Sequence, residues 1–225
     1  MKYDKIVKGT FLERPNRFIA YVNINGKKET CHVLNTGRCK ELLIKGATVY
    51  LNESDNINRK TKYDVVKVLK GEKLINMDSM APNKVAEEFF KKQFKNVKRE
   101  VKYKNSRFDL FIEDNNTFIE VKGVTLEKDN IAMFPDAPTE RGRKHIYELV
   151  DAVKNGYNAK ILFVIQFKGA EKFIPNYKTD PEFKKALKFA KENGVEILAY
   201  DCSVTKDSME INERVKVCLD SLLPI

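Results

Sequence analysis

The first third of the chain alternates apolar and polar residues with a period of two, which predicts short β-strands. Residues 17–24 alternate in this way, and the Asn25-Gly26 pair that follows them is typical of a tight hairpin turn. The other expected strands are residues 5–12, 27–34, 47–51 and 63–69. About five short strands in this length favour a small Greek-key barrel of the oligonucleotide-binding type.

A change of pattern follows at residues 77–84, which we interpret as the joint between two domains, 1–80 and 81–225. Residues 83–94 place Val85, Phe89 and Phe90 at helical spacing. Ser79 or Asn83 is expected to cap this helix. The sequence leaves the choice between the two caps open.

The second region alternates strands and helices. The expected strands are 97–103, 106–113, 117–123, 159–166 and 195–200, the expected helices are 139–155 and 181–193, and the segment up to Pro138 is expected to be a loop. This order predicts an α/β domain with a mixed sheet and helices on both faces. The fold class is therefore an all-β barrel followed by an α/β domain.

Composition adds a charge imbalance. The chain has 42 basic and 32 acidic residues, a formal charge of +10, and residues 1–80 alone hold 16 basic and 9 acidic residues, a surplus of seven. Nucleic acid is the partner that this charge favours, although a generally Lys-rich composition explains it equally well. No apolar run approaches bilayer length and no secretory leader is recognisable, so we expect a cytoplasmic protein with no membrane contact.

The motifs of several other enzyme classes are missing. The chain contains no G-x-G-x-x-G, no P-loop and no G-x-S-x-G, and its four cysteines form no C-x-x-C pair. Nucleotide-cofactor, serine-hydrolase and structural-zinc chemistry are therefore disfavoured.

A basic loop joins two of the barrel strands. Residues 56–63 combine Arg59, Lys60 and Lys62 with Tyr63, as single-strand binding by base stacking in a basic groove requires. An ordinary solvated hairpin loop is the alternative. Arg38, in the turn-like Asn35-Thr36-Gly37-Arg38, is a further expected phosphate contact.

Charged residues interrupt the predicted hairpin of the second region. If strands 106–113 and 117–123 fold back around Asn115-Asn116, then Phe111 lies opposite Glu120 and Asp109 lies opposite Lys122. Asp109, Glu120 and Lys122 would then share one face. This placement requires an even-length turn, since a slip by one residue would scatter the three groups.

Two carboxylates beside an ammonium group suit a hard divalent cation. Mg²⁺ or Mn²⁺ would be held by Asp109 and Glu120, with water and phosphate as the other ligands. Lys122 would orient the water or offset charge in the transition state, and the reaction would be phosphodiester hydrolysis. The alternative is that Glu120 and Lys122 mark the solvated face of a half-exposed hairpin.

D-L-F-I-E followed by I-E-V-K, in this order of helix and strands, resembles the PD-(D/E)-x-K nuclease superfamily. Over the whole chain, the segments P-N-R-F, N-T-G-R, S-R-F-D, F-I-E-V-K-G-V-T-L and F-P-D-A-P-T-E-R-G-R-K-H resemble the sugar fermentation stimulation protein family. The resemblance implies an oligonucleotide-binding barrel joined to a restriction-endonuclease-like domain, with DNA as the partner. The family name describes a phenotype of sugar metabolism and specifies no reaction.

The superfamily resemblance also implies residue roles. Asp109 and Glu120 match its metal ligands, Lys122 its lysine, and Glu87 or Glu88 a further carboxylate from the first helix. Some members carry Q-x-x-x-Y on the second helix, where this chain has Arg143 to Tyr147. The contact made by that Gln is therefore in doubt.

The start of the second helix is densely basic. Pro138 precedes Thr139, which we expect to cap the helix and favour a phosphate at its N-terminus. The expected DNA contacts around it are Arg107, Arg141, Arg143, Lys144 and His145. For His145, substrate contact or a structural role is favoured over proton transfer.

Two functions follow from the sequence. One is a metal-dependent DNA nuclease, and the other is a DNA-binding regulator of sugar metabolism that keeps the nuclease scaffold without turnover. The preferred DNA structure, single-stranded or duplex, and the oligomeric state are not determined by the sequence.

Overall fold

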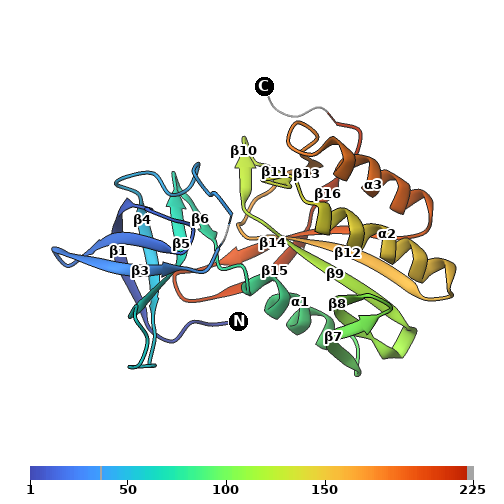
Figure 1. The fold of residues 1–225 in the computed structure, drawn as a ribbon, viewed down its shortest axis with the longest axis horizontal. Coiled ribbons are helices and arrows are strands. Elements are labelled where there is room, and N and C mark those ends of the chain that lie inside the picture. Colours follow the sequence, from blue (N-terminus) through green and yellow to red (C-terminus); the bar gives the residue numbers. More distant parts are fainter. Residues whose placement is uncertain (36, 222–225) are drawn as a thin grey trace.

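The structure is a computed structural model that describes residues 1–35 and 37–221. It consists of a β-barrel formed by the first third of the chain and an α/β domain formed by the rest (Figure 1). Thr36, in the expected turn after the third strand, lies outside the described residues. Among the helices that the structure describes, none is long and apolar enough to cross a membrane.

Six strands of the described chain form the barrel sheet. They are β1 (Ile6–Glu13), β2 (Ile19–Ile24), β3 (Lys27–Val33), β4 (Thr48–Glu53), β5 (Tyr63–Lys70) and β6 (Lys73–Asn76). β1 pairs with both β2 and β4, and parallel pairing of β3 with β5 closes the barrel. This five-strand connectivity is that of the oligonucleotide-binding barrel, which confirms the prediction. β6 is added beyond β5 and leads into the second domain.

The β2–β3 hairpin forms as its sequence predicts. Asn25 and Gly26 both have positive φ angles, 51° and 84°, and Ile24 pairs with Lys27. A two-residue turn with both residues in the left-handed region matches the twist of the flanking strands.

The α/β domain is built on a six-stranded mixed sheet. In spatial order its strands are β15 (Met209–Arg214), β14 (Glu196–Val204), β12 (Asn158–Ile165), β9 (Thr117–Val124), β8 (Ser106–Ile112) and β7 (Val97–Tyr103). The three central strands are mutually parallel. α1 (Ala81–Lys91) packs on one face, and α2 (Glu140–Lys154) and α3 (Pro181–Glu192) pack on the other (Figure 1). The mixed sheet with helices on both faces is confirmed.

A second, small sheet was not expected. Within the segment predicted to be a loop, the structure forms β10 (Leu126–Lys128) and β11 (Ile131–Phe134), which join β13 (Lys172–Pro175) and β16 (Lys216–Val217). The loop prediction was therefore wrong. Strands of two to four residues are too short to show an alternating pattern.

The predicted cap of α1 was also wrong. The N-cap residue is Met80, which makes no side-chain capping hydrogen bond. The Ser79 hydroxyl donates to the Leu34 carbonyl, and the Asn83 amide donates to Asp109. Both side chains are used in tertiary contacts, which take priority over the local cap.

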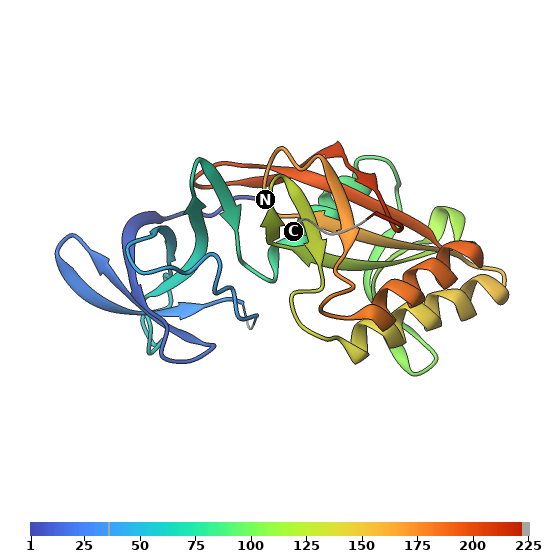
Figure 2. The ribbon, with the colours of Figure 1, turned by 90° about the horizontal axis from the view of Figure 1, so that it is seen from above.

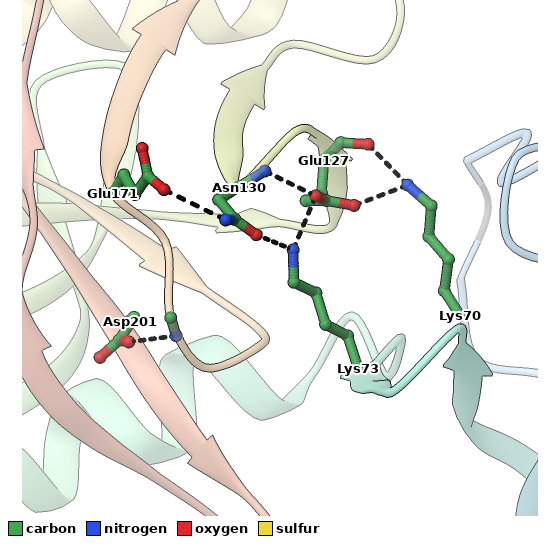
Figure 3. Close-up of polar contacts among 7 residues, drawn as sticks. Lys70, Lys73, Glu127, Asn130, Glu171 and Asp201 are labelled. Carbon is green, nitrogen blue, oxygen red and sulfur yellow. Dashed lines mark hydrogen bonds and ion pairs between the residues drawn. The ribbon is translucent and has the colours of Figure 1, made fainter.

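Two ion pairs to one buried carboxylate join the two domains. Lys70 and Lys73 extend from the β5–β6 hairpin to Glu127 in β10, with Nζ to Oε2 and Nζ to Oε1 distances of 2.7 Å and 2.8 Å (Figure 3). Burial raises the pKa of Glu127, but the two ammonium groups and the Asn130 N–H outweigh it and hold the pKa at about 2. The ionised carboxylate therefore ties the barrel to the α/β domain.

A buried lysine lies at the same boundary. The Lys67 side chain in β5 is fully buried; its Nζ donates to the Lys206 carbonyl at 3.0 Å and lies 4.0 Å from the centroid of the Tyr3 ring. Burial lowers the pKa of Lys67 to about 8. The first residues of the chain also contact the α/β domain, since Lys2 pairs with Ser208.

Candidate active site

The β8–β9 hairpin brings the predicted triad together, with a register that differs from the prediction. Phe111 pairs with Phe118 and Leu110 with Ile119, so the predicted pairing of Phe111 with Glu120 was wrong. The turn is longer than two residues, because Glu113–Asn115 form a 3-10 turn and Asn116 adopts a left-handed conformation. The register differs by two residues, and a shift of two keeps a side chain on its face.

Asp109, Glu120 and Lys122 line one hollow of about 460 Å³, which we call the carboxylate hollow. Asn83 and Pro82 of α1, Gly123 of β9, and Arg141 and His145 of α2 also line it. The side chains therefore come from both faces of the sheet and meet where β8 and β9 separate. The solvated-face alternative does not describe Glu120, which is 3% exposed.

Glu120 has one satisfied and one unsatisfied oxygen. Its Oε1 accepts hydrogen bonds from Lys122 Nζ at 2.6 Å and from His145 Nδ1. Its Oε2 is buried and has no hydrogen-bond partner among the residues that the structure describes. Burial raises the pKa of Glu120, but the hydrogen bond from His145 and the charge of Lys122 outweigh it, so the pKa lies below its usual range. A buried, ionised oxygen without a partner is costly unless a cation or donor binds it.

Asp109 is held in place from two elements. Its Oδ1 accepts from Asn83 Nδ2 at 2.7 Å, and its Oδ2 accepts from the Val121 N–H at 2.8 Å. Burial and the charge of Glu120 raise the pKa of Asp109 to about 6. Two carboxylates that disfavour each other's ionisation gain stability from a cation between them.

This donor set fits a hard divalent ion. The described residues contain no group of three or more His, Cys, Asp or Glu side chains arranged to hold a metal. Mg²⁺, however, is typically bound through one or two carboxylates, with water and phosphate as the other ligands. Asp109 and Glu120, with the unpartnered Oε2, meet that requirement.

The first helix does not supply a carboxylate to this hollow. Glu87 pairs with Lys91 at 2.7 Å and lies 3.6 Å from Arg99, and Glu88 pairs with the N-terminal amino group of Met1 at 2.7 Å. Neither lines the carboxylate hollow, which corrects the expectation for both. The contribution of α1 is Asn83, and nothing in the sequence links Asn83 with a residue 26 positions away.

The basic residues of α2 divide into two groups. Arg141 and His145 line the carboxylate hollow together with Arg107 of β8, and Lys144 lines an adjoining hollow with them. Arg143 instead makes an ion pair with Asp180, with an Nη1 to Oδ2 distance of 2.7 Å. Asp180 caps α3 and is buried. Arg143 therefore holds α2 against α3, and the expected DNA contact from it is corrected.

Thr139 caps α2 as expected. Its Oγ1 accepts the Gly142 N–H at 3.0 Å. A Cβ on Gly142 would lie 2.7 Å from that oxygen, so the close approach favours glycine there.

The barrel loop of residues 56–63 does not form the expected stacking groove. Tyr63 is 9% exposed and belongs to the core, and Arg59 makes two hydrogen bonds to Asp64, at 2.7 Å and 2.6 Å. Lys62 pairs with Glu53 at 3.0 Å, whereas Lys60 is exposed. Tyr63 is buried because β5 begins at this residue, and the stacking role assigned to it is corrected.

Arg38 lies elsewhere on the barrel, in a hollow of about 540 Å³ that also includes Arg17, Lys40 and Lys45. Lys40 and Lys45 have no signal in the sequence, whereas Arg17 belongs to the turn-like run of residues 13–17, for which a DNA contact is the second interpretation. Arg38, Lys40 and Lys45 lie in the one segment between β3 and β4, and the fold brings Arg17, between β1 and β2, beside them. Arg14 lies beside them, but its guanidinium donates to four carbonyl oxygens of the surrounding turns.

The first domain is a closed barrel with the connectivity of oligonucleotide-binding barrels. The second has a mixed sheet whose adjacent strands carry Asp109, Glu120 and Lys122. Together they define a two-domain protein with a restriction-endonuclease-like second domain. Two family models agree: residues 12–77 match "SfsA N-terminal OB domain" and residues 80–208 match "Sugar fermentation stimulation protein RE domain". The chain belongs to the sugar fermentation stimulation protein family.

Individual relatives cover nearly the whole chain. A sugar fermentation stimulation protein homolog of Clostridium beijerinckii is 55% identical over 226 residues, covering 97% of this chain and 100% of its own. That of Ruminiclostridium cellulolyticum is 56% identical with the same coverage. A solved structure, "The structure of Pyrococcus Furiosus SfsA in complex with Ca2+", is similar with a TM-score of 0.86 and 29% identity, over 96% of this chain and 97% of that one. The family and the two-domain architecture expected from the sequence are confirmed.

Proposed function

We propose that the protein is a metal-dependent nuclease that binds DNA and hydrolyses phosphodiester bonds at the carboxylate hollow. The observation that carries the proposal is the buried Oε2 of Glu120, which has no partner and lies in a hollow shared with Asp109. The restriction-endonuclease-like domain and the basic barrel support the same proposal. The cytoplasm is the expected location.

The cation would be Mg²⁺ or Mn²⁺, held by Asp109 and Glu120. The solved relative from Pyrococcus Furiosus is described in complex with Ca²⁺, which supports a hard divalent ion for this chain too. When bound, such an ion polarises a phosphoryl oxygen and makes water a better nucleophile.

The residues around the carboxylates have separable roles. His145 holds the Glu120 carboxylate in one orientation through its Nδ1. Lys122 lies 2.6 Å from Glu120 Oε1 and is 15% exposed at its side chain, so its ammonium group would offset negative charge on the reacting phosphate. Arg107, Arg141 and Lys144 would bind the neighbouring phosphates of the DNA.

The test combines cleavage and metal binding. Purified protein is incubated with single-stranded, duplex and branched DNA in Mg²⁺ or Mn²⁺, and Mn²⁺ binding is measured by calorimetry. Asp109→Asn and Glu120→Gln are expected to abolish both cleavage and Mn²⁺ binding. Glu88→Gln, a matched change on α1 away from the hollow, is expected to retain both.

Cleavage that survives unchanged in both carboxylate variants would overturn the proposal. Metal and DNA binding without cleavage of any substrate would support the alternative function, a DNA-binding regulator that retains the nuclease scaffold. The surplus of seven positive charges in residues 1–80 is the observation that favours that alternative.

A further inference from the structure

We propose that the nucleic acid bound at the carboxylate hollow is a single strand that continues across the domain boundary and is anchored by its phosphates in a basic hollow on the barrel. This inference rests on the proposed function for the reacting end of the strand. Its support comes from three hollows that share lining residues.

The barrel hollow is the one lined by Arg17, Arg38, Lys40 and Lys45. All four residues are exposed. Within the described chain, none of their side chains makes an ion pair or a hydrogen bond. Its one acidic lining residue, Glu13, lies 3.2 Å from Lys28. Four cations without partners in one concavity form an electrostatic site for phosphates.

Several other basic groups of the barrel have partners. Arg59 is bound by Asp64, Lys62 by Glu53 and Lys5 by Asp55. Lys8, Lys27 and Lys60 are exposed and also have no ion-pair partner among the described residues, but none of them lines the barrel hollow. Within the described barrel, the unpaired cations that share one hollow are those at the turn after β1 and in the segment after β3.

A second hollow connects this surface with the carboxylates. The boundary hollow, about 380 Å³, shares Gly37 with the barrel hollow and shares Ser79 and Gly123 with the carboxylate hollow. Its walls come from both domains, and the two are in close contact: a Cβ on Gly37 would lie 2.7 Å from Asp136 Oδ2. Figure 2 shows the segment after β3 facing the loop that precedes α2. The three hollows are therefore neighbours on the surface, each sharing a lining residue with the next, and the proposed path follows them in that order.

The dimensions of the path favour a single strand. Hollows of about 540, 380 and 460 Å³ are the size of pockets that hold one small-molecule ligand, so each suits one or two nucleotides. A duplex is too wide to lie inside such pockets and would reach them only with backbone phosphates, whereas a single strand can also place a base in the boundary hollow. Phe18, which directly follows Arg17 in the chain but does not itself line the barrel hollow, is 51% exposed and offers an aromatic surface for a base.

The boundary hollow is polar, without a cation. Asn35, Ser79, Thr125 and Gln166 line it together with the exposed carboxylate of Asp136. Asp136 disfavours a phosphate beside it, so a base or sugar edge would lie there. The phosphates would bind at the two basic ends, near Arg141 and near Arg38.

The test measures binding in EDTA, where no metal-dependent cleavage occurs. Fluorescence anisotropy follows a labelled oligothymidylate of about 20 nucleotides over a range of NaCl concentrations. Arg38→Glu/Lys45→Glu is compared with Lys8→Glu/Lys27→Glu, a control with the same charge change on exposed barrel positions outside the hollow. Thermal melts establish that both variants fold.

The expected result is a loss of affinity of about tenfold or more in the Arg38/Lys45 variant relative to the control. Its salt slope is expected to fall by about 1.4, as for two lost phosphate contacts on a single strand. An oligonucleotide of about two nucleotides, which fills only one hollow and can bind at either basic end, should lose less affinity in the variant than the long strand does. Phe18→Ala should weaken binding of the long strand.

Equal affinities of the two variants for the long strand would overturn the inference, as would an equal loss for duplex DNA of the same length. Failure of the proposed function is distinguishable, because it appears as absence of cleavage in Mn²⁺ with the binding difference intact. Cleavage abolished by Asp109→Asn, together with unchanged binding in the Arg38/Lys45 variant, would retain the nuclease and reject the path.

Discussion

The Nζ of Lys73 lies 2.8 Å from Glu127 Oε1, although Lys73 belongs to the barrel and Glu127 to the α/β domain. Lys70 binds the other oxygen of the same carboxylate at 2.7 Å. Loss of the negative charge on this buried carboxylate is expected to destabilise the fold, because the positive charges of both lysines are then left without a partner.

Acid is therefore expected to weaken the protein through Glu127. Its pKa is about 2 in the folded protein and 4.5 in the reference state. A lowered carboxylate pKa contributes stability above about pH 4.5 that disappears as the pH falls towards 2. The contribution is about 3 kcal/mol. Urea unfolding of wild type and Glu127→Gln at pH 7, 5 and 3 should show a difference at pH 7 that shrinks at pH 3; a constant difference would contradict this.

Lys67 is expected to behave in the opposite sense. Burial lowers its pKa to about 8, from a reference value of 10.5. Below pH 8 the lysine is charged in both states, and the buried charge destabilises the fold. Between pH 8 and 10.5 the free energy of unfolding therefore rises with pH. Lys67→Met should raise the free energy of unfolding at pH 7 by about 1–2 kcal/mol.

The gain from Lys67→Met should be largely lost by about pH 10, where the lysine is neutral in the folded state and close to its reference pKa of 10.5 in the unfolded state. Urea unfolding at pH 7 and pH 10 measures it. Destabilisation at pH 7 would mean that the contacts with the Lys206 carbonyl and the Tyr3 ring outweigh the burial of the charge.

Gly123 permits the close approach of α1 to the sheet. A Cβ there would lie 2.6 Å from Gln166 Oε1 and 2.7 Å from Pro82 Cγ. Gly123→Ala is expected to destabilise the protein by about 1–3 kcal/mol, because the start of α1 must shift. Adding Gln166→Ala should not restore the loss, because Pro82 still obstructs and the hydrogen bonds from buried Gln166 to Asn76 and to the Asp78 carbonyl are removed as well. An unchanged melting temperature would contradict the close contact.

Asn83 is expected to support the metal site through Asp109. Removing its hydrogen bond to Asp109 Oδ1 in Asn83→Ala should weaken Mn²⁺ binding about tenfold, as is typical for groups that orient a ligand. Glu87→Gln, one helical turn further along α1, should leave it unchanged, because Glu87 does not line the hollow. Calorimetric titration with Mn²⁺ compares the two; equal losses would show that α1 acts only through its overall position.

Periodicity determined much of the fold. The β2–β3 hairpin was predictable because Asn25-Gly26 is a local turn signal, and α2 because Thr139 caps a helix with regular apolar spacing. The prediction that Asp109, Glu120 and Lys122 lie together was correct although the predicted register was two residues off. Side chains two residues apart in a strand point to the same face, so an error of two residues left each of them on its predicted face.

Other features depend on contacts between distant segments, for which a single sequence carries no local signal. Asn83 donates a hydrogen bond to Asp109 instead of capping its own helix. Arg143 forms an ion pair with Asp180, and Tyr63 is buried in the barrel core. The sequence by itself determined the strands, the helices and the chemical groups available. Only the tertiary structure decided which charges are neutralised by partners and which remain free, because that depends on burial and on neighbours far away along the chain.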